Sequence, residues 1–551
     1  MDTYDTPSHV KQTSPFEAWW RGAVIYQVYP RSFKDSNNDG VGDLPGITSK
    51  LDYIASLGVD AIWLSPFFPS PQVDFGYDVS NYTDVDPQFG TMADFDSLVK
   101  KSHSLGLKVI IDQIYSHTSD QHPWFTESRQ GQHNAKSDWY VWADAKPDGS
   151  PPSNWQSVFG GPAWEWDSRR KQYYLHNFLK EQPDLNLHND EVREAILEVA
   201  RFWLRHGADG FRLDALNFAM HDPSLRDNPP ANIEMEFVTR PFDMQLHMFS
   251  RSYRDIPLFL EELRNELNQY PDRFTVAEVV GADAIEEMRS FTHGDARLNA
   301  AYNFDFLYAE QISSERVRNS LEQWDSEASQ GWPAWAFSNH DAPRAVSRWA
   351  TEEERSKAAR VYLMLLLALK GTLFLYQGEE LGLPQANVPF EKLKDPEAIA
   401  NWPLTLGRDG ARTPMPWVNV GRNAGFSDEG TETWMPVDDA QIKLCVEEQD
   451  QDPNSNLAFS RMALKLRKEH EPLLHGRLFF ADAPDGVLMM RRESEGESCV
   501  CIFNLSSQTA DWPDGIGAAL PILSSLQVGA PETELPEKLP PLSAWWLSTV
   551  V

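Results

Sequence analysis

Short apolar segments alternate with helix-like segments along most of this chain, and this alternation constrains its fold more than any other feature. Segments 47–57 and 93–105 space their apolar residues as helices do. Strands joined through helices form right-handed units with parallel strands, and eight of them close into a (β/α)8 TIM barrel, an α/β fold. The eight predicted strands are 24–29, 61–64, 108–112, 210–214, 275–278, 300–304, 334–338 and 372–376.

The alternation lapses in two places, and each lapse indicates a further domain. Residues 115–186 are rich in Trp, Pro and Gly and predict a small inserted domain after the third strand. From residue 474 to residue 551 the chain turns to short β-like runs, which predict a C-terminal antiparallel β-sandwich. The barrel then comprises 19–114 and 187–473, preceded by a disordered arm over 1–18.

Composition excludes several classes of partner. The 551 residues carry 49 basic and 82 acidic side chains, a net charge of −33, which argues against nucleic acid and anionic membranes as partners. The three cysteines have the spacing of neither a disulfide framework nor a zinc site. We see no secretory signal and no run long enough to span a membrane, so we expect a cytoplasmic monomer or homodimer.

A polar loop after the first predicted strand has the spacing of a cation-binding loop. The expected ligands are the side chains of Asp35, Asn37, Asp39 and Asp43 and the backbone carbonyl of Val41. Oxygen ligands at alternate positions around a glycine are typical of the first part of a calcium loop, although the terminal Glu of an EF-hand is missing. We expect structural Ca²⁺ in preference to Mg²⁺, and no organic cofactor. A surface loop built on Asx turns would show the same pattern.

Polar side chains stand at the C-terminal ends of the predicted strands, where a barrel of this kind carries its active site. Arg212 and Asp214, two residues apart on one strand, point to the same side, and taken alone they would indicate a structural ion pair. Paired carboxylates beside Arg and His fit glycoside hydrolysis. A metal centre is the alternative, but the histidine spacing matches no known metal motif. The other polar residues at strand ends are Asp112, His117, Glu278, His340 and Asp341.

Five motifs at these positions resemble the α-amylase superfamily, family 13 of the glycoside hydrolases. Four of them are 112–117 (DQIYSH), 210–217 (GFRLDALN), 276–278 (VAE) and 337–341 (FSNHD). The fifth, 182–186 (QPDLN), resembles the oligo-1,6-glucosidase/α-glucosidase branch rather than amylases that act on starch. The resemblance runs from about residue 19 to the end of the chain.

The resemblance implies a role for each matching residue. Asp214 would be the nucleophile that forms a covalent β-glucosyl intermediate, and Glu278 the general acid and then base. Asp341 would bind the 2- and 3-hydroxyls of the glucose, and Arg212 would keep Asp214 ionised. Such a closed pocket would release one glucose at a time from the non-reducing end. The other implied substrate-binding residues are Asp74, Tyr77, His117, Phe159, Phe178, Gln182, Ala215, His340 and Arg408.

Ala215, directly after the implied nucleophile, bears on the linkage that is cleaved. In this branch Val at the position accompanies α-1,6 cleavage, whereas Ala or Thr accompanies α-1,4 cleavage. A stiff β-branched side chain would narrow the junction between the glucose pocket and the acceptor site. Ala215 therefore predicts preference for maltose and other short α-1,4 glucosides, with sucrose as a further substrate and transglucosylation as a second outcome.

Two departures from the family pattern leave the acceptor side open. Tyr115 and Ser116 stand where many members have Val and Asn, and the loop 216–258 is idiosyncratic. Oligo-1,6-glucosidase, sucrose isomerase and trehalose synthase activities share the expected pocket and stay open as alternatives. The non-catalytic transporter-chaperone subunits with this fold are disfavoured, because they have a membrane span and have lost catalytic carboxylates.

Overall fold

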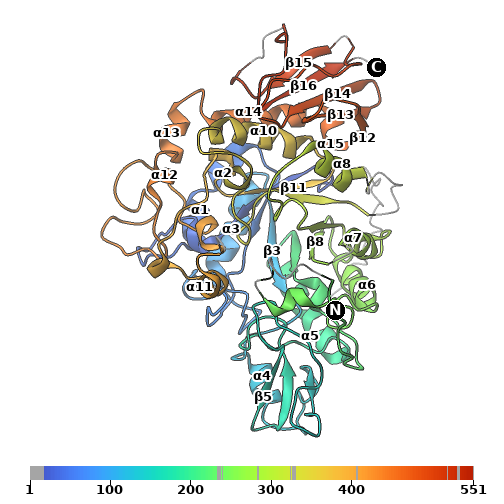
Figure 1. Ribbon diagram of the computed structural model, residues 1–551. Helices are drawn as coiled ribbons and strands as arrows, with labels where there is room; N and C mark the ends of the chain where they lie inside the picture. The colour runs from blue at the N-terminus through green and yellow to red at the C-terminus, as the bar shows by residue number, and fades with distance from the viewer. Residues whose placement is uncertain are drawn as a thin grey trace, which may run out of the picture.

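The computed structural model describes residues 18–232, 238, 240–281, 284–322, 324, 331–404, 407–517, 519–529 and 534–549. The arm expected over 1–18 lies outside these residues except for Ala18. Figure 1 shows three parts in a row, with a small sheet at one end, the barrel in the middle and the C-terminal sheet at the opposite end.

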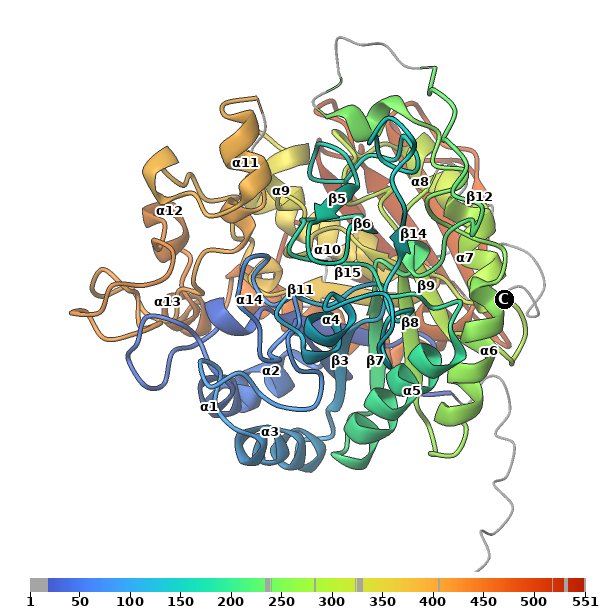
Figure 2. The same ribbon diagram turned by 90° about the horizontal axis from the view of Figure 1, so that it is seen from below.

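One sheet of eight parallel strands forms the centre of the molecule, in the order β10-β11-β1-β2-β3-β7-β8-β9. A parallel bridge between Ala301 on β9 and Pro333 beside β10 joins its two edges. The predicted (β/α)8 barrel is therefore confirmed (Figure 2). The strands are β1 (Val24–Val28), β2 (Ala61–Leu64), β3 (Lys108–Ile114), β7 (Gly210–Asp214), β8 (Phe274–Val279), β9 (Ala300–Asn303), β10 (Ala334–Ala336) and β11 (Thr372–Tyr376).

Alternation along the strands decides which side chains enter the barrel. Ile110 on β3 and Val276 on β8 belong to the inner core, whereas their neighbours pack outward under the helices. Successive side chains of a strand point to opposite faces, so the residues two positions further along also point inward. In this way the strands carry Asp112, Glu278 and Arg212 into the barrel at its C-terminal end.

The helices surround the barrel as the sequence predicts, with one difference. The segment expected as one helix over 47–57 is two helices, which meet at Lys50 with a backbone φ of −109° and ψ of 6°. The main helices are α1 (Leu44–Ser49), α2 (Leu51–Leu57), α3 (Met92–Ser104), α5 (Asp190–Arg205), α6 (Ile256–Leu267), α7 (Ala284–Thr292), α8 (Ser314–Glu322), α9 (Ala345–Trp349), α10 (Arg355–Ala368), α13 (Val446–Gln451), α14 (Asn456–Glu469) and α15 (Glu471–His475). Helix α10 is apolar on most sides because it lies between the barrel and the C-terminal sheet (Figure 1).

A small antiparallel sheet lies between β3 and α5 in the chain. Its strands are β4 (Trp142–Ala143), β5 (Trp164–Asp167) and β6 (Gln172–Leu175), in the order β4-β6-β5, preceded by helix α4 (Pro123–Ser128). Aromatic rings fill the space around it, and the Phe125 and Trp142 rings stack 5.6 Å apart. This is the Trp-rich stretch for which the sequence predicts an inserted domain.

The C-terminal region is an antiparallel β domain, as predicted. Its described strands form a single sheet in the order β12-β13-β14-β16-β15, with bounds β12 (Arg477–Ala481), β13 (Val487–Ser494), β14 (Glu497–Asn504), β15 (Ala519–Ser524) and β16 (Ser543–Thr549). One face, which includes Met490 and Trp546, joins the main core. The other face, which includes Trp545, packs against loop residues such as Trp512 and Leu539. Loops rather than strands therefore form the second layer there.

None of the helices in the described part of the chain is both long enough and apolar enough to cross a membrane.

Candidate active site

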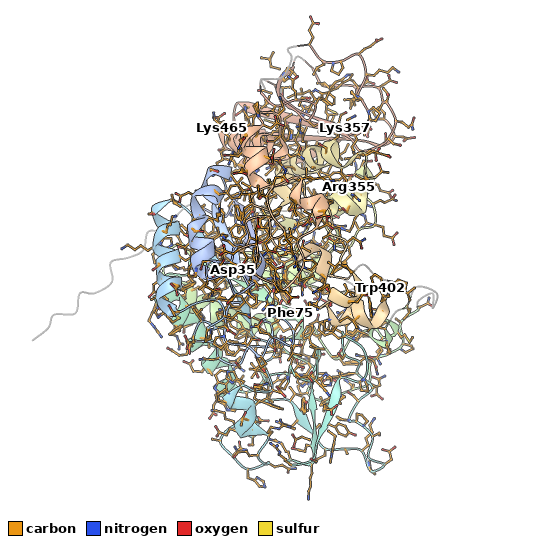
Figure 3. All side chains as sticks on the ribbon, turned by 90° about the vertical axis from the view of Figure 1, so that its left-hand side faces the viewer. Asp35, Phe75, Arg355, Lys357, Trp402 and Lys465 are labelled. Atoms are coloured by element: carbon orange, nitrogen blue, oxygen red, sulfur yellow. The ribbon has the colours of Figure 1, made fainter. Side chains whose placement is uncertain are left out.

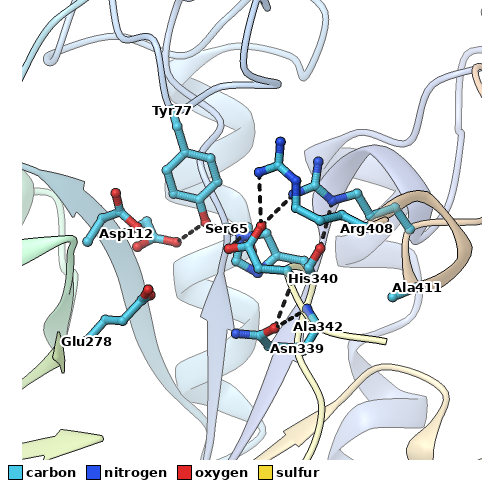
Figure 4. Close-up of polar contacts among 12 residues, drawn as sticks. Ser65, Tyr77, Asp112, Glu278, Asn339, His340, Ala342, Arg408 and Ala411 are labelled. Carbon is cyan, nitrogen blue, oxygen red and sulfur yellow. Dashed lines mark hydrogen bonds and ion pairs between the residues drawn. The ribbon is translucent and has the colours of Figure 1, made fainter. Parts of the chain in front are cut away.

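Arg212, fully buried near the end of β7, connects the carboxylates of three strands. Its Nη1 donates to Oδ1 of Asp112 at 2.8 Å and to Oδ1 of Asp214 at 2.6 Å. Its Nη2 forms an ion pair with Oε2 of Glu278. The hydroxyl of Tyr302 accepts from Nε of Arg212 at 3.0 Å and donates to Glu278 at 3.1 Å. One guanidinium thus positions three carboxylates at the barrel mouth, and Figure 4 shows Asp112 and Glu278 directed toward the same region.

Two further arginines hold Asp341, which follows β10. Nη2 of Arg412 lies 2.6 Å from Oδ1 of Asp341, and Nη1 of Arg408 lies 3.3 Å from the same oxygen. Arg412 also donates through Nε to the carbonyl of His340 at 2.7 Å. Arg408 reaches Oδ1 of Asp74 at 3.4 Å. Arg408, labelled in Figure 4, therefore contacts both Asp74 and Asp341, and these are two of the residues to which the family resemblance assigns substrate binding.

Rings and amides form the wall of the same pocket. The Tyr77 ring stacks on the His340 ring with centroids 5.4 Å apart, and its hydroxyl contacts Nε2 of His340. Gln182, from the inserted region, donates to Oδ2 of Asp74 at 3.1 Å. The Nε2 atoms of Gln182 and His117 are 3.2 Å apart. The structure thus brings together residues that the chain separates by more than 250 positions.

Apolar side chains line the side of the pocket next to Asp214. The Arg408 guanidinium lies 5.3 Å over the Phe159 ring, and the Phe159 and Phe178 rings are 6.0 Å apart. Ala215 is buried and packs in one cluster with Phe178 and Phe218. Its backbone adopts the left-handed conformation, with φ 44° and ψ 38°, which is uncommon for a residue other than Gly, Asn or Asp.

The two carboxylates Asp214 and Asp341 differ in their electrostatic environment. Burial raises the pKa of Asp214, and the Arg212 guanidinium opposes that rise. Burial also acts to raise the pKa of Asp341, but the nearby cations outweigh it and hold the pKa well below its usual range. The His340 ring, whose Nε2 lies 3.1 Å from Oδ2 of Asp341, and the guanidiniums of Arg412 and Arg408 account for this effect.

The histidines of the pocket are neutral at physiological pH. Burial lowers the pKa of His117 to about 4 and that of His340 to about 3. Burial raises the pKa of Asp74 to about 6, with Arg408 opposing it, and the pKa of Asp112 to about 7. Neutral imidazoles in a polar pocket can donate or accept hydrogen bonds without attracting a counter-ion.

Sequence analysis missed three side chains that position this site, namely Tyr302, Arg412 and Asp395. The carboxylate of Asp395 is fully buried and accepts from Nε of Arg408 at 3.1 Å and from Nη2 at 3.0 Å. Asp395 also caps helix α11 (Pro396–Asn401). An Asp before Pro is typical of a helix start, and this local role conceals the contact with Arg408, which is 13 residues away.

We expect Asp395→Asn to weaken substrate binding by releasing Arg408. The amide keeps the shape of the side chain but removes its charge, which leaves the buried Arg408 less firmly placed against Asp74. We expect kcat/KM for the sugar substrate to fall about tenfold to hundredfold, mainly through KM. Asp450→Asn, which breaks an exposed pair with Arg461 of 2.6 Å, is the matched control and should change little. Unchanged kinetics in Asp395→Asn would contradict the positioning role.

The loop expected to bind a cation lies in the barrel layer, where Figure 3 labels Asp35. The buried carboxylate of Asp35 accepts backbone N–H groups from Asn37 and Asn38 at 3.1 and 2.7 Å. Asp43 caps α1 through the N–H of Gly46 at 2.6 Å. Asx turns therefore organise this loop, and no three of its carboxylates have oxygens that all lie within 4.8 Å of one another. The donor set still suits Ca²⁺, because one oxygen each of Asp35, Asp39 and Asp43 accepts only a single N–H and keeps a lone pair for a cation.

A (β/α)8 barrel with paired carboxylates at its C-terminal mouth and a pocket of acidic, arginine and aromatic side chains defines a glycoside hydrolase. The chain also matches the model of the alpha-amylase catalytic domain over residues 27–476. This protein therefore belongs to the α-amylase family, in the branch of α-glucosidases and oligo-1,6-glucosidases.

Similar proteins cover nearly the whole chain. A probable alpha-glucosidase from Rhizobium meliloti (strain 1021) is 48% identical over 503 residues, which span 90% of this chain and 91% of the relative. An oligo-1,6-glucosidase from Heyndrickxia coagulans is 37% identical and spans 90% of this chain and 94% of the relative. The crystal structure of the alpha-glucosyl transfer enzyme XgtA is 47% identical, with a TM-score of 0.92 and coverage of 96% of this chain and 99% of that one.

Proposed function

We propose that this protein is an exo-acting, retaining α-glucosidase that releases glucose from the non-reducing end of short α-1,4-linked oligosaccharides. Asp214 attacks the anomeric carbon and forms a β-glucosyl ester, while Glu278 protonates the leaving oxygen. Glu278 then removes a proton from water, which hydrolyses the ester and leaves α-glucose. Asp341 binds the 2- and 3-hydroxyls, and this interaction strengthens as the sugar ring flattens in the transition state.

The observation that carries this proposal is the contact of Arg212 with both Asp214 and Glu278. A single cation on two carboxylates from neighbouring strands holds them on either side of one reacting bond. We expect their carboxyl groups to be roughly 5–5.5 Å apart, the separation typical of retaining enzymes. Two other arginines, rather than Arg212, form ion pairs with Asp341, so its carboxylate can bind the sugar hydroxyls.

The proposed exo action follows from the residues around Arg408. Asp74 contacts both Arg408 and Gln182, and Arg408 also contacts Asp341. In this proposal the network closes that side of the pocket to a second sugar. The names of the relatives, alpha-glucosidase and oligo-1,6-glucosidase, support a glucoside as substrate. Digestion of maltotetraose tests the proposal, because glucose and maltotriose should appear together first. Early release of intact maltose from the non-reducing end of longer chains would contradict it.

Transfer of glucose to a second sugar is proposed as an alternative fate of the intermediate. XgtA, 47% identical, is an alpha-glucosyl transfer enzyme, which supports this possibility for a chain of such similarity. Product analysis at high maltose concentration should reveal trisaccharides alongside glucose. Conversion of sucrose or maltose mainly into isomeric disaccharides would instead identify an intramolecular transferase.

We expect Ala215→Val to shift the linkage preference from α-1,4 toward α-1,6. Ala215 lies in an apolar cluster beside Asp214, so added methyl groups would narrow the acceptor side of the pocket. An α-1,6 link has an extra rotatable bond and can avoid the obstruction. One such contact is worth about 1–3 kcal/mol of discrimination, which corresponds to roughly 10- to 200-fold. The measurement is kcat/KM for maltose divided by kcat/KM for isomaltose.

The ratio of the two substrates serves as the control for this variant. A β-branched residue at the left-handed position 215 also strains the backbone. Both substrates place the same glucosyl group in the pocket, so this strain affects both kcat/KM values and cancels in the ratio. If the wild type preferred isomaltose, or if Ala215→Val left the ratio unchanged, the acceptor loop rather than residue 215 would determine which linkage is cleaved.

We also propose that the loop of residues 35–43 binds a structural Ca²⁺. Side-chain oxygens of Asp35, Asn37, Asp39 and Asp43 with the carbonyl of Val41 would supply the ligands. A cation that binds only the folded state stabilises it, so chelation should lower the unfolding temperature and added CaCl₂ should restore it. Asp39→Ala should remove this response, whereas Asp84→Ala, on another surface loop, should keep it. If neither chelator nor calcium changed the unfolding temperature of the wild-type protein, the proposal would be refuted.

A further inference from the structure

Three side chains of metal-ligand type meet where the barrel joins the C-terminal sheet, at the end of the molecule opposite the inserted sheet (Figure 1). His470 lies between α14 and α15, and Glu497 and Cys499 lie on β14. Nδ1 of His470 is 2.6 Å from Oε1 of Glu497. The ligand atoms of all three residues, including the thiol sulfur of Cys499, lie within 4.8 Å of one another.

A simple ion pair does not account well for this arrangement. The side chains of His470 and Glu497 are 22% and 31% exposed, so a pair between them contributes little to stability. Cys499 is fully buried, and its thiol sulfur lies within 4.8 Å of the carboxylate of Glu497. The close approach of a carboxylate and a thiol is stabilised when one cation binds both groups.

We propose that His470, Glu497 and Cys499 form a Zn²⁺ site that connects the C-terminal sheet to the last helices of the barrel. The three donors are a nitrogen, an oxygen and a sulfur, a set that suits this borderline-soft ion. Donor atoms in a tetrahedral zinc site lie about 3.5 Å from one another, so the partly exposed His470 and Glu497 need to move only slightly. Their exposure leaves the fourth position to water.

The protons and charges of the proposed site balance. Ligation through Nδ1 requires a neutral His470 imidazole with its proton on Nε2, so a proton held between Nδ1 and Glu497 moves to Nε2 or leaves when the metal binds. The Cys499 thiol releases its proton to water, so binding should weaken as the pH falls. Arg492, the neighbour of Cys499 on β13, is a buried cation. Thiolate and carboxylate together cancel the charge of Zn²⁺, so Arg492 meets a neutral complex.

Cobalt binding tests the proposal directly, because a cobalt–thiolate bond gives a charge-transfer absorption band that oxygen ligands do not. The full-length protein is stripped of metal with a chelator and titrated with Co²⁺, then with Zn²⁺. We expect one equivalent of Co²⁺ to produce the band and Zn²⁺ to abolish it. Cys499→Ser should lose the band. Cys501→Ser, on the same strand and equally buried, and Cys445→Ser are the matched controls and should keep it.

Ligand variants and stability provide a second readout. His470→Ala and Glu497→Gln should each lower the affinity for Zn²⁺ at least tenfold. Zn²⁺ should raise the unfolding temperature of the wild type and of Cys501→Ser but not that of His470→Ala. Absence of the thiolate band in the wild-type protein, or a band that survives in Cys499→Ser, would overturn the proposal. Neither readout depends on catalytic activity.

Discussion

Replacement of Asp214 by alanine is expected to abolish hydrolysis of maltose while the barrel stays folded. The proposed nucleophile has no substitute, because Asp112 is occupied by Arg212, Trp63 and Tyr77. Loss of a covalent nucleophile costs about 10⁴-fold or more in kcat. The fold should survive because the side chain lies at the end of β7, where removal creates a polar, solvent-accessible space rather than a void in the core.

Chemical rescue separates loss of the nucleophile from loss of the fold. In Asp214→Ala, azide can enter the space left by the carboxylate and attack an activated α-glucoside, which gives β-glucosyl azide. We expect azide to restore turnover in both Asp214→Ala and Glu278→Ala, but with opposite products: β-glucosyl azide from Asp214→Ala by direct attack, and α-glucosyl azide from Glu278→Ala by attack on the ester of Asp214. Asp305→Ala is the matched control and should keep most of its activity, because the carboxylate of Asp305, after β9, only accepts from Nδ2 of Asn303 at 3.3 Å and from Ser320 at 3.4 Å. α-Glucosyl azide from Asp214→Ala would contradict the assignment.

Arg212→Gln is expected to cause the second large loss. The variant leaves Asp112, Asp214 and Glu278 close together without their shared cation. Removing one partner of a buried ion pair costs about 3–5 kcal/mol, so we expect a lower unfolding temperature as well as a loss of kcat/KM of about 10³-fold. Arg201→Gln, which disrupts a network with Glu266 at the surface, is the control.

The pH profile of Arg212 variants separates charge from geometry. Asp214 must be ionised to attack, so kcat/KM falls as the pH drops through its pKa. Loss of the adjacent cation should raise that pKa and move the acid limb of Arg212→Gln upward by about 1–3 pH units. Arg212→Lys keeps the positive charge but not the planar guanidinium. We therefore expect a lower kcat/KM in this variant but little shift of the acid limb of its pH profile. An unmoved limb in Arg212→Gln would mean that the cation does not set the ionisation of Asp214.

The barrel and the polar residues at its mouth could be predicted because both depend on local patterns. Each strand is a short apolar run, and alternation along it determines that Arg212 and Asp214 face inward. The helix expected over 47–57 was predicted less well, since nothing in its apolar spacing indicates the break at Lys50. The C-terminal domain has a second layer of loops because Trp512 and Leu539 cover an apolar face without forming strands.

Contacts between distant segments could not be predicted from the sequence. Arg412 reaches Asp341 across 71 residues, and Asp395 acts on Arg408 from a helix cap. In both cases the contact positions the site because the charged groups are buried, and the burial of a residue is known only from the structure. The cluster of His470, Glu497 and Cys499 could not be predicted either. The spacing of the cysteines in the sequence matches no zinc motif, and only the fold brings His470 and Glu497 next to Cys499.

The anomeric configuration of the first product tests the central claim most directly. Proton NMR of the hydrolysis of p-nitrophenyl α-glucoside, whose leaving group contributes no glucose, distinguishes α-glucose from β-glucose when it is recorded before mutarotation is complete. Two successive displacements, first by Asp214 and then by water, retain configuration, so the account predicts that α-glucose appears first and β-glucose later through mutarotation. β-Glucose as the first product would show a single displacement by water and would contradict the covalent role of Asp214.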